Sequence, residues 1–205
     1  MLQFKRNTAK QKYAEQGGNI VFDDQMIISV GELKEQGLSY YKINKLVENG
    51  VLRKLNKRYY ENINYSGELT DFSYIPAYIP QGVICLMSAA VYYDLTNYMP
   101  HSVDVAIPRK SRVSTLPDWP SIDLYYYTDY RYNLGIEENN NIRIYDIEKT
   151  VVDIIYYRER MGIDTAKEAL VNYLRRKDRN LNKLIRYADK CKCGEIMRTY
   201  LEVLI

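Results

Sequence analysis

Apolar positions near the start of the chain recur at the spacing of short amphipathic helices. Residues 2–15 show this spacing and are followed by glycines at 17–18, so a first helix is expected there. A second helix is expected after Ser29, because Ser29 and Glu32 have the Ser-x-x-Glu spacing of a capping box. Gly37 ends this second helix after about two turns.

A third helix is predicted from Ser39, its expected N-cap, to Gly50, which stands at the C-terminal stop position. Ile43 and Leu46 share one apolar face at helical spacing. Two helices joined by a short turn around a glycine are typical of a helix-turn-helix. The opposite, outward face then carries Tyr40, Tyr41, Asn44, Lys45 and Glu48.

Two short β-like runs follow within residues 51–60 and flank Asn56-Lys57. Asn tolerates the positive φ that a tight hairpin turn demands, so we expect a two-stranded wing. Basic residues lie on or beside its tip, where phosphate or minor-groove contact is their natural use. The sequence therefore predicts a winged helix-turn-helix over residues 1–62.

The rest of the chain predicts a connector at 63–80 and an α+β domain at 81–205. Residues 84–95 are expected to form a helix, and residues 103–107, 122–127 and 142–145 to form strands. Prolines between the first two strands favour a loop over a tight hairpin. Helices are expected at 147–161, 165–177, 181–191 and 195–204, with Asp146, Asp164 and Asn180 as N-caps.

Charge is distributed unevenly along this chain of 205 residues, whose formal net charge is +3. The first 60 residues hold 11 Lys or Arg and 6 Asp or Glu, a net charge of +5. The remaining 145 residues hold 18 and 20, a net charge of −2. A basic head on a faintly acidic body favours a polyanion as the partner of the head. The 22 tyrosines, against 3 Phe and 1 Trp, supply much of the aromatic core material.

Composition argues against several other classes of function. The longest apolar stretch, residues 83–93, is too short for a membrane-spanning helix of roughly 20 residues. An odd number of cysteines, three, favours a reduced, cytoplasmic compartment. The Cys191-Lys-Cys193 spacing and a lone His101 do not supply a tetrahedral zinc site. No metal and no other cofactor is expected.

Two patterns are candidates for a catalytic centre, although we expect the protein not to be an enzyme. Lys149 and Asp153 are four residues apart, so they can pair as a helix salt bridge; Glu148, five residues before Asp153, lies poorly on the same face. Asp104 or Asp123 with the basic run after residue 108 has a superficial likeness to a nuclease centre. That run is better explained as a second basic surface, formed by Arg109, Lys110 and Arg112.

These features together resemble the AbiEi antitoxins of abortive-infection, type IV toxin–antitoxin systems. The resemblance covers nearly the whole chain and rests on the segments at residues 30–33, 37–39, 46–52, 88–90, 105–108, 144–153 and 168–170. One departure is Lys57-Arg58, where the family often carries Arg-Gly before the tyrosine of the wing; it adds positive charge.

The resemblance implies an antitoxin that represses its own operon by binding inverted repeats in double-stranded DNA. It also implies a functional partner, a nucleotidyltransferase-like toxin, whose direct contact with the antitoxin is left open. An alternative is a stand-alone regulator whose second domain senses a ligand or a protein, and a weaker one is a DNA-binding nuclease. The residues expected to contact DNA are Ser39, Tyr40, Tyr41, Lys42, Asn44, Lys45, Arg53, Lys54, Asn56, Lys57 and Arg58.

Overall fold

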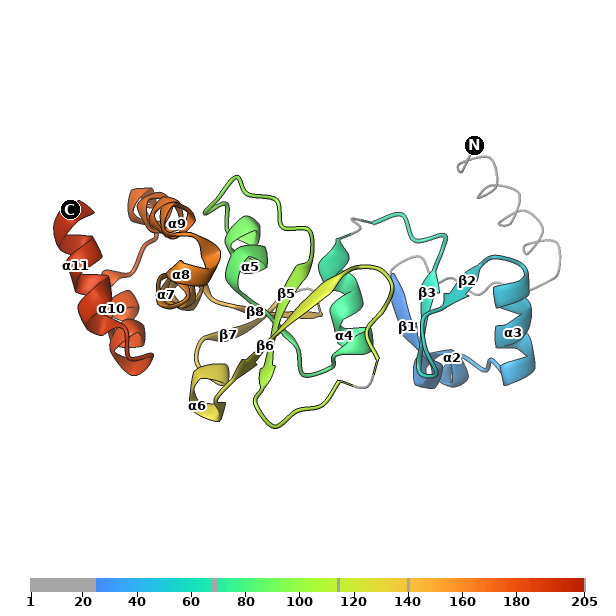
Figure 1. The fold of residues 1–205 in the computed structure, drawn as a ribbon. Helices are drawn as coiled ribbons and strands as arrows, with labels where there is room; N and C mark the ends of the chain where they lie inside the picture. The colour runs from blue at the N-terminus through green and yellow to red at the C-terminus, as the bar shows by residue number, and fades with distance from the viewer. Residues whose placement is uncertain (1–24, 68–69, 114, 140, 205) are drawn as a thin grey trace. The chain divides into compact units, whose positions relative to one another are not determined.

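The computed structural model describes residues 25–67, 70–113, 115–139 and 141–204 (Figure 1). The chain divides into two compact units, Met1–Pro80 and Gln81–Ile205, and each is described by itself. The helix predicted over residues 2–15 lies outside the described residues. The described chain has a mixed α and β architecture with two small sheets and a helical C-terminal part.

The first unit combines two helices with a three-stranded antiparallel sheet. Its elements are β1 (Ile27–Ser29), α2 (Val30–Glu35), α3 (Tyr40–Glu48), β2 (Leu52–Lys54) and β3 (Tyr59–Asn62). The strand order is β1-β3-β2, so β3 pairs with both of the other strands. The sheet and both helices bury one apolar cluster, which consists of Ile28, Leu33, Leu38, Ile43, Leu46, Val51, Leu52 and Tyr60.

The helix boundaries in this unit follow from the capping residues, as predicted. The Ser29 amide donates to Glu32 Oε2 at 2.7 Å, and the Glu32 amide donates to Ser29 Oγ at 3.2 Å, so the capping box is confirmed. Ser39 caps α3 by accepting from the Lys42 amide at 3.4 Å. Gly37 and Gly50 follow the two helices with φ of +79° and +71°, a conformation that glycine adopts without strain.

The loop between β2 and β3 closes in a different way from the expected tight turn. Asn56 is not among the described residues with positive φ. Its side-chain Oδ1 instead accepts the amides of Arg58 at 2.8 Å and Tyr59 at 3.0 Å. The loop spans four residues, 55–58, and the side chain supplies the hydrogen bonds that a two-residue turn would have made through the backbone.

Residues 63–80, predicted as a connector, contain a 3-10 helix η1 (Asp71–Tyr74) and α4 (Ile75–Tyr78). This segment is bonded to the β2–β3 hairpin. Asn56 Nδ2 donates to the Ala77 carbonyl at 2.9 Å, and the Tyr74 hydroxyl donates to Glu61 Oε1 at 2.9 Å. The segment is therefore part of the first unit, because its hydrogen-bond partners lie on the hairpin.

The second unit contains a five-stranded mixed sheet of order β6-β5-β4-β8-β7. The strands are β4 (Val83–Ile84), β5 (Val103–Pro108), β6 (Ile122–Tyr127), β7 (Ile136–Asn139) and β8 (Ile142–Tyr145). The strands predicted from alternation correspond to β5, β6 and β8. β5 and β6 are parallel, which requires the longer connection that the prolines had indicated. β7 pairs antiparallel with β8.

The helices of the second unit are α5 (Leu86–Tyr92), α6 (Asp129–Tyr132), α7 (Ile147–Tyr156), α8 (Arg158–Met161), α9 (Ile163–Arg175), α10 (Leu181–Lys190) and α11 (Gly194–Leu204). The helix expected from residue 84 begins two residues later, because Ile84 pairs with Val105 and Ile144 in the sheet. Asp164 is not an N-cap; it lies in the first turn of α9, which follows Gly162. Asp146 and Asn180 cap α7 and α10 as predicted.

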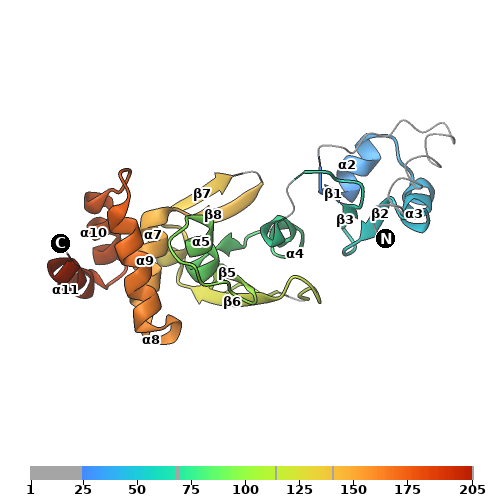
Figure 2. The same cartoon turned by 90° about the horizontal axis from the view of Figure 1, so that it is seen from above.

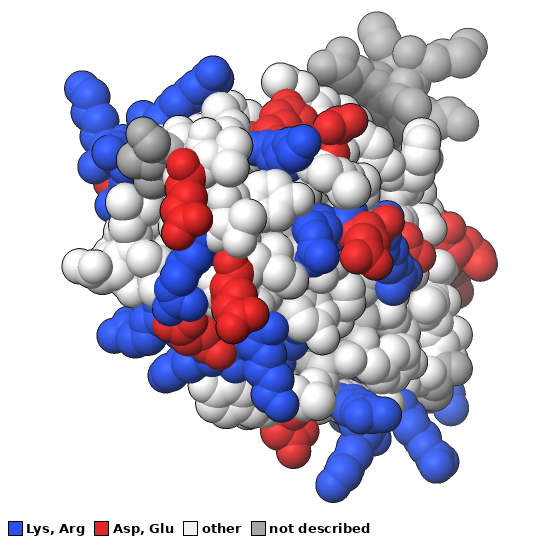
Figure 3. Space-filling model, turned by 60° about the vertical axis from the view of Figure 1, so that its left-hand side comes forward, with Lys and Arg blue, Asp and Glu red and all other residues white. Residues whose placement is uncertain are grey.

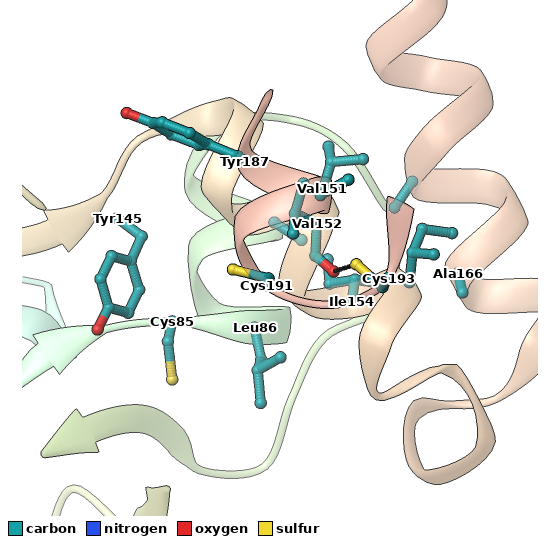
Figure 4. Packing of buried hydrophobic residues seen from close by; sticks show 14 of the residues in the cluster. Cys85, Leu86, Tyr145, Val151, Val152, Ile154, Ala166, Tyr187, Cys191 and Cys193 are labelled. Atoms are coloured by element: carbon teal, nitrogen blue, oxygen red, sulfur yellow. Dashed lines mark hydrogen bonds between the residues drawn. The ribbon is translucent and has the colours of Figure 1, made fainter. Parts of the chain in front are cut away.

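Helix α7 is the centre of the second unit. It contacts α5, α9, α10 and α11, and the last three lie on its side away from the sheet (Figure 2). All three cysteines are buried in this core, where Cys193 Sγ lies 3.9 Å from the Val152 carbonyl oxygen (Figure 4). No helix in the described part of the chain is long and apolar enough to span a membrane.

Candidate nucleic-acid interface

Helix α3 presents a polar and aromatic face opposite its buried side. Ile43 and Leu46 are fully buried, whereas Tyr40 and Tyr41 are 58% and 72% exposed. Asn44, Lys42 and Lys45 are exposed on the same side as the tyrosines, and Ser39 is exposed at the start of the helix. The predicted outward face of this helix is therefore confirmed.

Two lysines lie against the exposed tyrosine rings. Lys34 Nζ, from α2, lies 4.2 Å from the centroid of the Tyr40 ring. Lys45 Nζ lies 5.9 Å from the centroid of the Tyr41 ring and 2.8 Å from Glu48 Oε2. The Glu48 carboxylate raises the pKa of Lys45. Lys34 was not among the residues chosen from the sequence, because its contact crosses the turn between the two helices.

The hairpin of β2 and β3 contributes a second group of cationic side chains. Some of them form ion pairs within the described chain and others do not. Lys54, Lys57 and Arg58 are exposed and form no ion pair with any residue that the structure describes. Arg53 is engaged, since its Nε donates to Glu61 Oε2 at 2.6 Å. The amide of Asn56 is also engaged, in the three hydrogen bonds that shape the loop.

Glu61 is therefore the residue that engages Arg53 in an ion pair, and it was not identified from the sequence. Its carboxylate is largely buried and accepts from both Arg53 and the Tyr74 hydroxyl. Burial, with the hydrogen bond to Glu61, raises the pKa of Tyr74 to about 12. No pattern along β3 signals this contact, because it follows from the strand register, which pairs Glu61 with Arg53.

The second basic surface expected from the sequence lies on the second unit. Arg109, Lys110 and Arg112 are exposed in the loop after β5, where the Arg109 amide donates to the Tyr127 carbonyl at 2.7 Å. On the face drawn in Figure 3, Lys and Arg side chains lie interspersed with Asp and Glu among the described residues. Opposite charges that alternate in this way produce a weaker field than a cluster of one sign.

The residues weighed as a catalytic centre form a buried ionic cluster inside the second unit. Lys149 and Asp153 are fully buried, and their ion pair confirms the predicted i, i+4 salt bridge. Arg131 donates to the same carboxylate through Nη2 at 2.6 Å. Glu148 instead accepts from the Tyr173 hydroxyl at 3.2 Å and pairs with Lys183 at 2.9 Å. These contacts account for the cluster as part of the folded core.

The described residues contain no cluster of side chains with the geometry of a metal site. No three His, Cys, Asp or Glu side chains among those residues are placed to hold a metal ion together.

Comparison with known proteins leaves the family open. No family model matches the sequence, and no curated protein matches it significantly. Among solved structures, the chain is similar to the crystal structure of the RV2827C protein from Mycobacterium tuberculosis. That match has 13% sequence identity and a TM-score of 0.47, and it covers 88% of this chain and 77% of the other. At that TM-score the likeness carries no functional argument.

Proposed function

We propose that the first unit is a winged helix-turn-helix that binds double-stranded DNA, with α3 as the recognition helix and the β2–β3 hairpin as the wing. The observation that supports this most is the exposed face of α3, which combines aromatic, amide and cationic side chains. An Asn side chain can bond adenine through two hydrogen bonds, and a helix of this kind fits the major groove. Asn44 is the residue of this face best suited to read a base.

The wing supplies the contacts that do not depend on sequence. Lys54, Lys57 and Arg58 form no ion pair with any described residue, so each can neutralise a phosphate without first breaking an ion pair to the part of the chain that the structure describes. Arg53 is tied to Glu61 and contributes less. Lys34, stacked on Tyr40, adds a cation beside the start of the recognition helix.

A salt series of gel shifts on DNA from upstream of the protein's own gene tests the binding. Affinity is expected to fall steeply with salt, and the double variant K57A/R58A is expected to lower the slope of log K against log salt by about 2. The matched control is K167A/K190A, which removes the same charge from exposed positions of the second unit. Absent or salt-independent binding by the wild type would refute the proposal.

Sequence preference tests the orientation of α3 separately. N44A is expected to relax the preference at particular base pairs by about 1–3 kcal/mol, while the wing variant weakens binding to all sequences alike. Selection of preferred sites from a randomised DNA pool measures the difference. An unchanged preference in N44A means that another face of the first unit meets the bases.

We further propose that the chain is an antitoxin and autorepressor, as its resemblance to the AbiEi antitoxins implies, acting against a nucleotidyltransferase-like toxin. Repression requires DNA binding by the first unit, so neutralising the toxin falls to the second. A toxin-like gene directly downstream and relief of its growth arrest by co-expression of this chain are the expected results. Failure of the full chain to relieve that arrest would contradict the antitoxin role.

A second candidate is a stand-alone regulator whose second unit senses a small molecule. The observation that favours it is a cavity of about 270 Å³ in that unit, whose lining includes Asp104, Asp123 and Arg160. Absence of a toxin-like gene beside this one, with DNA binding intact, favours this candidate over the antitoxin.

A further inference from the structure

The cavity lies at the amino ends of the parallel strands β5 and β6, in the second unit. Asp104 and Asp123 contribute from the two strands, Tyr98 from the loop before β5, and Arg160 from α8. Its volume of about 270 Å³ is below the ~300–1,000 Å³ typical of sites for drug-sized molecules. The cavity therefore suits a small metabolite.

The two aspartates extend from the same face of the sheet. Asp104 and Asp123 are register partners in a parallel pair, and side chains at paired positions point to one side. Asp104 Oδ2 accepts the amides of Met87 at 3.0 Å and Ser88 at 3.3 Å, and Asp123 Oδ2 accepts from Ser102 Oγ at 2.6 Å. Neither carboxylate forms an ion pair with a residue that the structure describes.

Arg160 lines the same cavity and forms no ion pair with either carboxylate. The Arg160 guanidinium lies 4.6 Å from the centroid of the Tyr125 ring. Its neighbour Arg158 pairs with Glu159, whereas Arg160 forms no ion pair within the described chain. A guanidinium that stacks on an aromatic ring keeps its N–H donors in a plane, ready for a carboxylate in bidentate geometry.

The cavity thus contains two carboxylates and one guanidinium that do not pair with one another. A ligand that meets both must carry a positive and a negative charge. We infer that the cavity binds a small zwitterion of the α-amino-acid class, whose ammonium group lies at Asp104 and Asp123 and whose carboxylate lies at Arg160. A simple amine would leave Arg160 without a partner, and a simple acid would face two carboxylates. Tyr98 and Met161 form less polar walls against which the ligand's side chain can pack.

Burial of Asp104 is in keeping with this arrangement. The side chain is 5% exposed, and its desolvation raises its pKa to about 6. A ligand ammonium placed beside it would favour the ionised carboxylate and offset that desolvation. The inference does not depend on DNA binding or on an antitoxin role, because every group it uses lies in the second unit.

Isothermal titration calorimetry of the full chain at pH 7.5 with each of the twenty free amino acids tests the inference. At least one amino acid is expected to bind at one per chain. Two probes lack one charge each: the amine made by decarboxylating that amino acid, and its N-acetyl derivative. Both are expected to bind at least about 10-fold more weakly, because each leaves a charged group of the cavity unmet.

Two variants locate the binding. D123N and R160Q, both at exposed positions, are each expected to weaken binding of the amino acid by about 10-fold or more. Their matched controls are D118N and K190Q, each of which removes one charge of the same sign at an exposed position that does not line the cavity. Melting temperatures of all four variants show whether the fold is retained. If D123N fails to fold, R160Q still tests whether the cavity binds the amino acid.

Three results would overturn the inference. The first is that none of the twenty amino acids binds. The second is that the decarboxylated amine or the N-acetyl derivative binds as tightly as the amino acid, which would leave a site for one charge only. The third is that R160Q binds as the wild type does. All are measured without DNA, so they are distinct from failure of the proposed DNA binding.

Discussion

Replacing Asp153 tests whether the buried ionic cluster stabilises the second unit. Its carboxylate is fully buried and joins two cations: Oδ1 accepts from Arg131 Nε at 3.2 Å and Nη2 at 2.6 Å, and Oδ2 accepts from Lys149 Nζ at 2.5 Å. D153N keeps the shape of the side chain and removes its charge. Two cations are then left in the core without a counter-ion.

Removing one partner of a buried ion pair costs about 3–5 kcal/mol. D153N is expected to reach at least the upper part of this range, because two pairs are lost. The cations also face aromatic rings, with Lys149 Nζ 4.2 Å from the Tyr145 centroid and Arg131 3.7 Å from that of Tyr156. These contacts, worth about 2 kcal/mol each when desolvated, are already present in the wild type, so they do not replace the carboxylate that D153N removes.

Urea unfolding followed by far-ultraviolet circular dichroism measures the change in the free energy of unfolding. K149M is the matched comparison, because it removes one cation and leaves Asp153 paired with Arg131. We expect K149M to cost no more than about half as much as D153N. A loss below about 1 kcal/mol in D153N, or an equal loss in both variants, would refute this account of the cluster.

Three further predictions concern stability. S29A removes the capping box of α2 and is expected to cost about 1 kcal/mol in urea unfolding, whereas S66A, at an exposed position, changes little. G135A is expected to cost at least about 2 kcal/mol, because φ is +74° and an added Cβ would lie 2.9 Å from Lys149 Cβ; an unchanged melting temperature would contradict this. The pKa of Asp104 is raised from 3.8 to about 6, so the folded state binds more protons between pH 4 and 6. The wild type should therefore gain about 2 kcal/mol over D104N as the pH falls from 7 to 4, and parallel pH profiles would count against it.

Local signals in the sequence predicted several boundaries correctly. Ser29, Ser39, Asp146 and Asn180 cap helices because each interaction involves residues only three apart along the chain. The alternation over residues 122–127 likewise corresponds in full to β6. Such short-range patterns are independent of how the rest of the chain packs.

Elements that depend on distant partners were missed. Val83–Ile84 form β4 because they pair with β5 and β8, yet their apolar run continues into α5, and periodicity cannot separate the two. β7 has a polar sequence, Ile-Glu-Glu-Asn, and is held by its antiparallel pairing with β8. The short helices at 71–78 gave no amphipathic pattern long enough to read.

The candidate interface shows the same division. The outward face of α3 followed from helical spacing alone, whereas the ion pair between Arg53 and Glu61 depends on strand register. The juxtaposition of Asp104 and Asp123 depends on the register of two strands 19 residues apart, which the sequence does not encode in any local pattern.

The three buried cysteines allow unfolding of the second unit to be followed by thiol alkylation. Cys85, Cys191 and Cys193 are the only cysteines in the sequence, so the first unit carries no thiol. Burial raises the pKa of Cys191, and that of Cys193 to about 12, which keeps both as unreactive thiols. These thiols are therefore expected to be alkylated only when the core of the second unit opens. The alkylation rate then measures that opening alone, because the first unit has no thiol to react.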